Sequence, residues 1–558
     1  MNERKTINGQ LFEKMILGGV ANLQANLKTV NDLNVFPIPD GDTGENMYLT
    51  LQSGLNMLAE EKSERLCDKA HAVAQGMLLG ARGNSGVILS QLFYGLGEGL
   101  KSLDEADLTQ IAEALRLGVH CAYGAVAHPV EGTILTVARE AVETAQAKSS
   151  LDMTVEEFFA CLLKEMQKSL ERTPNLLAVL KEAGVIDSGG AGLVYITEGF
   201  CKTLGGEKVE NISPVASTQK AVDLSKFDEN SVMEFGYCTE LLLRLQTVKT
   251  DIDAFSVEEL IAFLETVGDS VVAFKTGSIV KIHVHTLTPY KVLEHCQKYG
   301  EYLTVKIENM TLQHNETHEK AEEETAVSVE IKMPKRARRK FATVIVASGD
   351  GLKDAFLEMG ADEVIWGGQT NNPSSEDFIK AFDKVNADFV FVLPNNGNIV
   401  MAAKQAAEMY QDSEIRVIES KNVGQGYSAL SMVDYDLDDA DAIEEQMKES
   451  MQNTITGMVA RSVRDASLNG VEVQKDKYMG FTDKTMLLCS ETKTAAACAL
   501  AEKLGVGEKE FLIVVHGKGV TEEEKESVRS FMSNTYPQIE VYEIDGGQDV
   551  YDFLLIIE

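Results

Sequence analysis

The hydrophobic periodicity of this chain changes twice along its length, and these changes constrain the fold more than any other feature. Residues 1–203 place apolar side chains at helical spacing, as at Leu89 and Leu92. Residues 231–312 mix strand-like and helix-like segments, and residues 340–558 alternate buried-strand runs with helices. We therefore expect a multidomain chain with an all-α domain, then an α+β middle domain, then an α/β C-terminal region.

Two stretches without clear periodicity separate the predicted domains. Residues 204–230 contain Gly-Gly, Ser-Pro and a mixed polar stretch, which is typical of a linker. Residues 311–340 contain three consecutive glutamates and then a basic cluster. The cluster consists of Lys335, Arg336, Arg338, Arg339 and Lys340. A solvated tether is the simpler interpretation of this second stretch, and a docking patch for a partner or a phosphate is the alternative.

The charge balance excludes some classes of partner. The 558 residues include 52 Lys plus Arg and 87 Asp plus Glu, for a net charge of −35. Because such a field repels phosphate, we expect no nucleic-acid partner. We expect no stable membrane insertion, since no apolar run of about 18 residues occurs. The absence of a secretory signal and the eight scattered cysteines favour a cytoplasmic location. A bound nucleotide would need a metal ion or focused backbone amides.

A proline-flanked acidic segment, from Asn34 to Met47, carries the strongest functional signal. Prolines 37 and 39 prevent a helix directly before Asp40 and Asp42, and the glycines that follow allow a tight turn. Two aspartates at this spacing can direct their oxygens at Mg²⁺, which takes carboxylate oxygens together with phosphate oxygens. An ordinary Asp-Gly turn is the alternative.

Three further small-residue segments precede predicted helices. They are Gly83-Asn84-Ser85-Gly86, Gly132-Thr133 and Asp187-Ser188-Gly189-Gly190. The amides at the start of a helix are free to bind an anion, and the helix dipole favours negative charge there. Each segment alone is weak evidence, because glycines at helix ends commonly serve as caps. Neither a P-loop nor a protein-kinase glycine loop is present.

Two of these segments carry a family resemblance. Asn34 to Met47, together with residues 80–91 (GARGNSGVILSQ), resembles the DhaL-like ATP-binding domain of dihydroxyacetone kinases. The whole chain resembles the kinase subunit of bacterial fatty acid kinases. The resemblance implies a helical barrel that binds ATP and two Mg²⁺ at one mouth, and a C-terminal region with a DegV-like fold. It also implies a fatty acid substrate that a separate DegV-like binding protein presents, and a middle domain that mediates homodimerisation.

The resemblance also assigns roles to individual residues. Asp40, Asp42 and Thr43 would be catalytic, with both aspartates as Mg²⁺ ligands. Asn34 is the nearest candidate for a third ligand, although its spacing differs by one residue from that of the family. The residues expected to bind the nucleotide are Asn46, Asn84, Ser85, Gly86, Gly132, Thr133, Asp187 and Gly189. Because a fatty acid carboxylate is already ionised at neutral pH, catalysis would rest on positioning and on charge neutralisation, with acyl phosphate and ADP as products.

The middle domain presents a candidate metal site. Its predicted order, β-α-β-β-α-β, is the ferredoxin-like arrangement, in which the first and third strands are adjacent and antiparallel. Cys238 should then lie opposite His285, and His283 should project from the same face as His285. One thiolate and two imidazoles suit a structural Zn²⁺, with water, Glu240 or another chain as fourth ligand. The alternative is a pair of surface histidines beside a small buried cysteine.

Two loops of the C-terminal region, residues 367–374 and 393–398, each follow a predicted strand. Ligand or partner contacts gather at the carboxyl ends of parallel strands, so these loops are candidates for docking the fatty-acid-binding partner, with structural turns as the alternative. A fatty acid kinase is the leading functional hypothesis. The alternatives are a dihydroxyacetone-type small-molecule kinase and a non-catalytic lipid- or nucleotide-binding regulatory protein.

Overall fold

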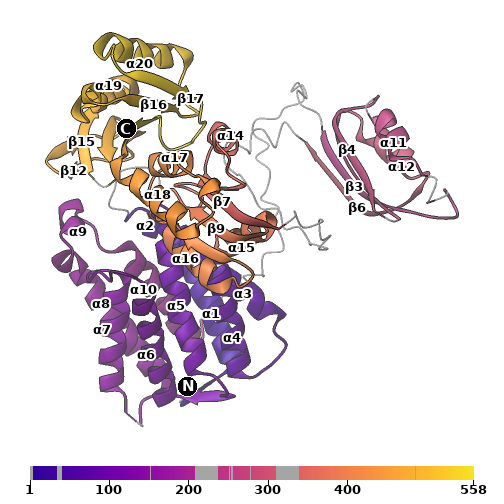
Figure 1. Ribbon diagram of the computed structural model, residues 1–558. Coiled ribbons are helices and arrows are strands. Elements are labelled where there is room, and N and C mark those ends of the chain that lie inside the picture. The colour runs from indigo at the N-terminus through magenta and orange to yellow at the C-terminus, as the bar shows by residue number, and fades with distance from the viewer. Residues whose placement is uncertain are drawn as a thin grey trace, which may run out of the picture. The chain divides into compact units, whose positions relative to one another are not determined.

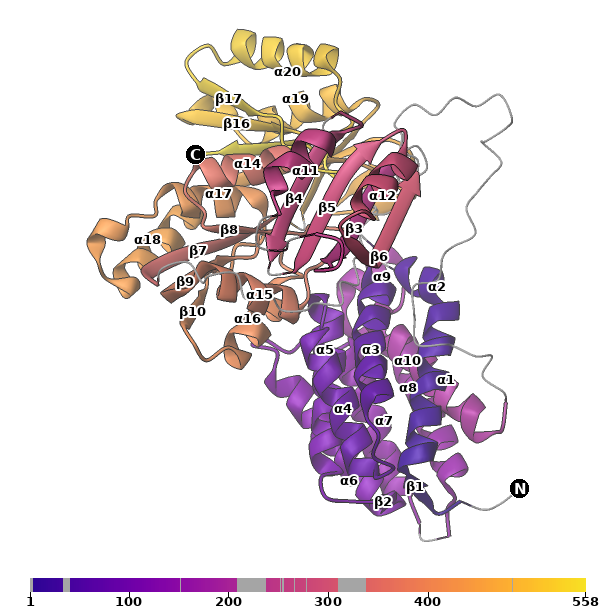
Figure 2. The ribbon, with the colours of Figure 1, turned by 90° about the vertical axis from the view of Figure 1, so that its right-hand side faces the viewer.

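The computed structural model shows three folded domains (Figures 1 and 2). It describes residues 4–33, 41–150, 152–207, 237–250, 252, 255–264, 266–276, 278–309, 338–483 and 485–558. The chain divides into two compact units, of which the first combines residues 1–216 with 333–558 and the second spans 217–332. The first unit therefore contains both the N-terminal and the C-terminal domain, and the second contains the middle domain.

The N-terminal domain is helical, as the periodicity predicted. Its helices are α1 (Gly9–Ala25), α2 (Leu27–Asn31), α3 (Thr43–Glu60), α4 (Leu66–Leu79), α5 (Gly83–Gly99), α6 (Leu108–Gly124), α7 (Ile134–Lys148), α8 (Val155–Leu176), α9 (Ala178–Ala183) and α10 (Ser188–Leu204). Two short strands that the periodicity did not predict, β1 (Thr6–Asn8) and β2 (Glu105–Asp107), pair antiparallel at one end of the domain (Figure 2).

Local sequence explains where several of these helices begin and how closely they pack. Asp107 and Thr154 start α6 and α8 with capping boxes, in which the cap side chain and the third helical residue satisfy each other's backbone amides. Helices α1 and α10 cross at glycines, since a Cβ atom added to Gly199 would lie 2.2 Å from the carbonyl oxygen of Gly18. The helices thus enclose one core that includes the fully buried Phe158.

The C-terminal region begins with a parallel sheet in the order β10-β9-β7-β8, as the alternating pattern predicted. Its strands are β7 (Arg339–Ala347), β8 (Glu363–Trp366), β9 (Ala387–Leu393) and β10 (Glu414–Val417). The helices of this part are α14 (Asp350–Glu358), α15 (Ser375–Val385), α16 (Val400–Met409), α17 (Val423–Ser431) and α18 (Ala440–Asn453). Loops at the carboxyl ends of β8 and β9 lead into α15 and α16.

A second, mixed sheet completes the C-terminal region, in the order β15-β14-β11-β18-β16-β17. Its strands are β11 (Ile455–Arg461), β14 (Tyr478–Thr482), β15 (Thr485–Ser490), β16 (Phe511–His516), β17 (Glu540–Ile544) and β18 (Phe553–Ile557). A hairpin of β12 (Ala466–Leu468) and β13 (Val471–Val473) and the helices α19 (Lys493–Lys503) and α20 (Glu522–Thr535) accompany it. Strands β16 and β18 pair antiparallel, whereas β16 and β17 pair parallel.

The described part of the basic cluster belongs to the folded C-terminal region rather than to a tether. Strand β7 already begins at Arg339. Arg338 forms an ion pair with Asp388 at 2.6 Å, and Arg339 forms one with Asp362 at 2.7 Å. Lys340 likewise pairs with a carboxylate, that of Asp438. These three cations neutralise acidic side chains of their own domain, and residues 335 and 336 lie outside the described residues.

The middle domain has the predicted ferredoxin-like topology. Its elements are β3 (Tyr237–Leu245), α11 (Val257–Leu264), β4 (Asp269–Thr276), β5 (Ile279–Thr286), α12 (Pro289–Cys296) and β6 (Gly300–Asn309). The sheet order is β4-β5-β3-β6 with every neighbouring pair antiparallel, and both helices cover one face (Figure 2). Cys238 lies opposite His285 and Glu240 opposite His283, which confirms the predicted register. The side chains of these four residues lie outside what the structure describes.

Among the residues that the structure describes, no helix combines the length and the apolar character needed to cross a membrane.

Candidate functional site

Helices α3, α5, α7 and α10 all begin at the end of the helical domain that is remote from β1 and β2 (Figure 2). Asp42 occupies the cap position of α3, and its side chain makes no capping hydrogen bond to that helix. The hydroxyl of Ser188, in the first turn of α10, donates to the hydroxyl of Thr43 at 3.3 Å. The structure therefore brings the Asp42-Thr43 segment and the Asp187-Ser188 segment together. Asn34 and Asp40 lie outside the described residues.

Helix α5 packs closely against α3 through two glycines. Gly83 adopts a φ of +58°, and a Cβ atom there would lie 2.6 Å from the side-chain nitrogen Nδ2 of Asn46. A Cβ atom on Gly86 would lie 2.4 Å from the hydroxyl oxygen of Thr50. Both glycines belong to the first turn of α5, so the prediction that the segment Gly83-Asn84-Ser85-Gly86 precedes its helix was wrong. They are small because α3 and α5 approach each other there.

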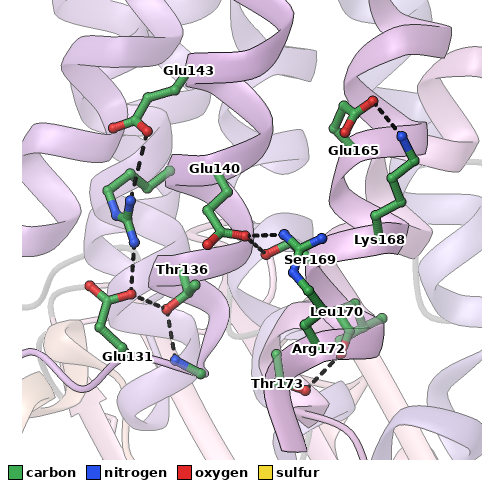
Figure 3. A network of polar contacts seen from close by, with 12 residues as sticks. Glu131, Thr136, Glu140, Glu143, Glu165, Lys168, Ser169, Leu170, Arg172 and Thr173 are labelled. Atoms are coloured by element: carbon green, nitrogen blue, oxygen red, sulfur yellow. Dashed lines mark hydrogen bonds and ion pairs between the residues drawn. The ribbon is translucent and has the colours of Figure 1, made fainter. Parts of the chain in front are cut away.

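The Gly132-Thr133 segment lies against the end of α8. Gly132 has a φ of +87°, and a Cβ atom added to it would lie 3.1 Å from the carbonyl oxygen of Thr173. Its amide donates to the hydroxyl of Thr136 at 2.8 Å, and that hydroxyl donates to Glu131 at 2.6 Å (Figure 3). Thr133 is the cap residue of α7. A side-chain network therefore fixes the backbone just before this helix.

Thr173 connects the same region to the start of α10. Its hydroxyl donates to the carbonyl oxygen of Leu170 at 2.7 Å (Figure 3). The same hydroxyl accepts from the backbone amide of Asp187 at 3.1 Å. The carboxylate of Asp187 in turn accepts from the amide of Gly190 at 2.6 Å. Gly189 packs against α7, since a Cβ atom on it would lie 3.3 Å from that of Ile134. The starts of α7 and α10 are thereby held side by side.

Asp187 has a perturbed acidity. Burial raises the pKa of its carboxyl group to about 6, and hydrogen bonds from the backbone amides of Gly190 and Ile134 oppose the shift. The folded state favours the protonated form of this group. Its ionisation therefore lowers the stability of the fold as the pH rises from the group's pKa in the unfolded chain to its pKa of about 6 in the folded chain. A carboxyl group with a raised pKa beside the clustered helix starts is a candidate for a functional role in addition to capping α10.

The C-terminal region contacts this end of the helical domain, which the sequence did not predict. The side-chain amide of Asn372 donates to the carboxylate of Asp42 at 2.5 Å. The guanidinium of Arg82, just before α5, donates to the carbonyl oxygen of Asn372 at 2.8 Å, and the amide of Ser375 donates to the carbonyl oxygen of Ala81 at 3.2 Å. The loop of residues 367–374 thus contacts the helical domain of its own chain, so part of it is not accessible for docking a partner.

The second predicted loop, residues 393–398, also contacts the helical domain. The side-chain amide of Asn84 lies 3.4 Å from the side-chain oxygen of Asn398. Further along, Gln405 of α16 donates to the carbonyl oxygen of Leu78 at 2.6 Å and accepts from Gln91 of α5 at 3.1 Å. The sequence indicated that both loops make contacts, because they follow parallel strands. It contained no signal for the surface that they contact.

The assigned residues therefore fall into groups. Asp42, Thr43, Asn46 and Asp187 lie at the cluster of helix starts. Asn84 faces the C-terminal loop, Gly86 and Gly189 pack between helices, and Gly132 fixes a turn. Ser85 and Thr133 are partly exposed at the starts of α5 and α7. The described part of the site combines the carboxylates of Asp42 and Asp187, hydroxyl groups and helix N-termini, which suits a hard cation together with a phosphate.

Comparison with known families agrees with this architecture. Residues 37–202 match the DAK2 domain, residues 234–317 match the middle domain of FakA-like fatty acid kinases, and residues 342–558 match the C-terminal domain of the same FakA-like family. These matches define a multidomain chain with a kinase-related N-terminal domain. Protein YloV of Bacillus subtilis (strain 168) is 39% identical over 564 residues, which cover 99% of this chain and 100% of that protein. The chain belongs to the FakA-like fatty acid kinase family, as its sequence predicted.

Other similar proteins include one uncharacterized protein of Staphylococcus aureus (strain NCTC 8325 / PS 47), which is 39% identical over 99% of both chains. Among solved structures, the dihydroxyacetone kinase from C. freundii in complex with AMP-PNP and Mg²⁺ is 20% identical over 36% of this chain and 35% of that chain, with a TM-score of 0.28. The fatty acid kinase B3 protein of Streptococcus pneumoniae loaded with linoleic acid is 13% identical over 39% of this chain and 99% of that chain, with a TM-score of 0.29.

Proposed function

We propose that this protein is an ATP- and Mg²⁺-dependent kinase that phosphorylates the carboxylate of a fatty acid. A DegV-like fatty-acid-binding protein would present the substrate, and the products would be acyl phosphate, for phospholipid synthesis, and ADP. Membership of the FakA-like fatty acid kinase family supports the substrate class. The observation that carries the reaction type is the position of Asp42 among the clustered helix starts of the DAK2 domain.

The residues at this end of the helical domain fit a magnesium–nucleotide complex. The carboxylate of Asp42 and the neighbouring hydroxyls of Thr43 and Ser188 are oxygen donors, which Mg²⁺ prefers. Two buried side-chain oxygens, of Asn84 and Asn372, have no hydrogen-bond partner within the described part of the chain. When bound, Mg·ATP would supply the phosphoryl group and neutralise part of its charge.

The residues of the chain would then bind the cation and the phosphate oxygens and orient the γ-phosphate. The helix starts at Thr43, Gly83 and Ser188 offer backbone amides to phosphate oxygens, and Asp42, with Asp40 and Asn34 as further proposed ligands, would hold the cation. The fatty acid carboxylate attacks the γ-phosphorus, a new oxygen–phosphorus bond forms, and the bond to the β-phosphate oxygen breaks. Since the carboxylate carries no proton at neutral pH, no general base is needed. Because the net charge of −35 repels a triphosphate, the cation and the backbone amides at the helix starts would both offset this repulsion.

The requirement for a carrier tests the proposal. We expect purified protein with Mg·ATP to release ADP only when a fatty acid and a DegV-like fatty-acid-binding protein are both present, because the acceptor carboxylate reaches the site only on its carrier. A coupled assay for ADP measures this, with each component omitted in turn.

Two other results would identify the alternatives. The match of residues 37–202 to the DAK2 domain favours, as second candidate, a dihydroxyacetone-type kinase, which would consume ATP with dihydroxyacetone and without a carrier. An absence of turnover under every condition would favour a non-catalytic lipid- or nucleotide-binding regulatory protein. Either result would overturn the fatty acid kinase.

The proposal extends to a structural Zn²⁺ in the middle domain, held by Cys238, His283 and His285. The register that places Cys238 opposite His285 supports it, because the thiolate and the imidazoles then belong to adjacent strands. Elemental analysis of chelator-washed protein should find close to one zinc ion per chain, and Cys238→Ala should lose it. Equal zinc content in both proteins would argue against this site. The homodimer and the cytoplasmic location stay predictions.

A further inference from the structure

Asn372, at the end of the loop after β8, reaches the acidic residue of the proposed kinase site from another domain. Its side-chain amide donates to Asp42, although the two residues are 330 positions apart in the sequence. Asn372 is 2% exposed, so this amide is withdrawn from bulk water. Its side-chain oxygen has no hydrogen-bond partner among the described residues. A buried asparagine with one hydrogen-bonding group unused is unusual, and it indicates that the present contacts do not complete its surroundings.

The position of Asn372 is fixed by the helical domain itself. Arg82 donates to its carbonyl oxygen at 2.8 Å and forms an ion pair with Asp377 of α15 at 3.7 Å. Gly83 leaves the space that Asn372 needs, since a Cβ atom on Gly83 would lie 3.2 Å from the side-chain nitrogen Nδ2 of Asn372. The start of α5 thus holds the loop of the C-terminal region over the start of α3.

A second contact from the C-terminal region reaches the other flank of the acidic segment. The guanidinium of Arg464, between β11 and β12, donates to the carbonyl oxygen of Asp32 at 3.2 Å. Asp32 follows α2, and Asp42 precedes α3. The C-terminal region therefore contacts the chain just before the segment that carries the proposed magnesium ligands, at Asp32, and within that segment, at Asp42.

We propose that Asn372 is a positioning residue of the kinase site: its amide orients the carboxylate of Asp42 for the magnesium–nucleotide complex. This inference rests on the proposed function. A carboxylate has about four acceptor positions on its two oxygens, so it can accept a hydrogen bond from an amide and bind a cation at the same time. A hydrogen bond to a charged acceptor is stronger than one between neutral groups and fixes the direction of the acceptor. The C-terminal region thereby acts on the phosphoryl-transfer site of its own chain.

Nucleotide binding to the full-length protein tests this role without requiring turnover. We expect Asn372→Ala to raise the dissociation constant for Mg·ADP by about 10- to 100-fold, the range for losing a hydrogen bond to a charged group. Isothermal titration calorimetry measures the constant at fixed Mg²⁺ concentration. Asn371→Ala, which removes the same amide from the adjacent residue, should bind Mg·ADP like the unaltered protein. Unchanged binding of Mg·ADP by Asn372→Ala would overturn the inference. Tighter binding would also overturn it, because the contact would then hinder nucleotide binding.

A double-mutant cycle separates positioning from a general effect on the fold. If Asn372 acts through Asp42, then Asn372→Ala should add no further loss of Mg·ADP binding in a protein that already carries Asp42→Ala, which removes the acceptor of the hydrogen bond. Additive losses would mean that Asn372 supports the structure only, and would refute the proposal. Thermal unfolding of each variant checks folding, and Asn372→Ser replaces Asn372→Ala if the latter does not fold.

The outcome is distinguishable from failure of the proposed function. Weakened Mg·ADP binding by Asn372→Ala, together with no turnover of fatty acid on its carrier by the unaltered protein, would remove the fatty acid kinase and keep the positioning role. A wild-type protein that does not bind Mg·ADP at all would remove both.

Discussion

Replacement of Asp42 by alanine is expected to lower carrier-dependent ADP release by about a thousandfold. A metal ligand contributes several kcal/mol of charge stabilisation during phosphoryl transfer, and about 1.4 kcal/mol corresponds to a tenfold change in rate. The steady-state rate at saturating Mg·ATP measures the effect. Because the side chain of Asp42 makes no capping hydrogen bond to α3, the helix itself should form without it.

Two further variants control for this result. Glu45→Ala removes the same charge from an exposed position in the first turn of the same helix, and it should retain nearly full activity. Asp42→Asn keeps a side-chain oxygen that can accept from Asn372 but removes the charge, so it should be impaired almost as strongly as Asp42→Ala. Retained turnover in Asp42→Asn would mean that the negative charge at this position does not hold the cation.

Replacement of Phe391 by alanine should destabilise the C-terminal region by about 3–5 kcal/mol, the range for a truncated buried aromatic side chain. Phe391 is fully buried in β9, which lies between β7 and β10, and its ring centroid lies 6.2 Å from that of Phe341. The strands β7 and β10 on either side of β9 hold the neighbouring side chains in place, so these side chains cannot fill the cavity that the substitution leaves. Urea unfolding followed by circular dichroism measures the shift in midpoint.

Leu357→Ala is the matched control for Phe391→Ala. It truncates an apolar side chain of the same region that is 41% exposed, so its unfolding midpoint should change little. Because the C-terminal region supplies Asn372, Phe391→Ala should also weaken Mg·ADP binding at urea concentrations that unfold only the variant. An unfolding midpoint equal to that of the unaltered protein would show that β9 is not the packed centre of its sheet.

The middle domain is the part whose arrangement could be predicted most completely from the sequence. Each of its six elements has a clear period, and the short turn between residues 276 and 279 makes β4 and β5 a hairpin. Given the β-α-β-β-α-β order, the ferredoxin-like topology follows, and with it the pairing of Cys238 with His285. Local pattern was sufficient there because every connection after α11 is short and limits which elements can lie side by side.

The helical domain was predicted less accurately at its helix starts. The segment Gly83-Asn84-Ser85-Gly86 has the composition of a loop, yet it forms the first turn of α5. Glycine disfavours a helix by only about 1 kcal/mol, and the close packing of α5 on Thr50 of α3 outweighs this preference. The same glycines that suggested an anion-binding loop are thus explained in part by the approach of two helices.

The sequence by itself determined the three kinds of domain, the order of elements in the middle domain and the acidic segment that contains Asp42, because apolar periodicity and turn composition are local properties of a chain. Only the tertiary structure decided which surfaces meet at that segment. The hydrogen bond from Asn372 to Asp42 joins residues 330 positions apart, and it depends on how the N-terminal and C-terminal domains pack against each other within one compact unit. No local pattern encodes such a contact, since the packing is set by the complementarity of whole surfaces.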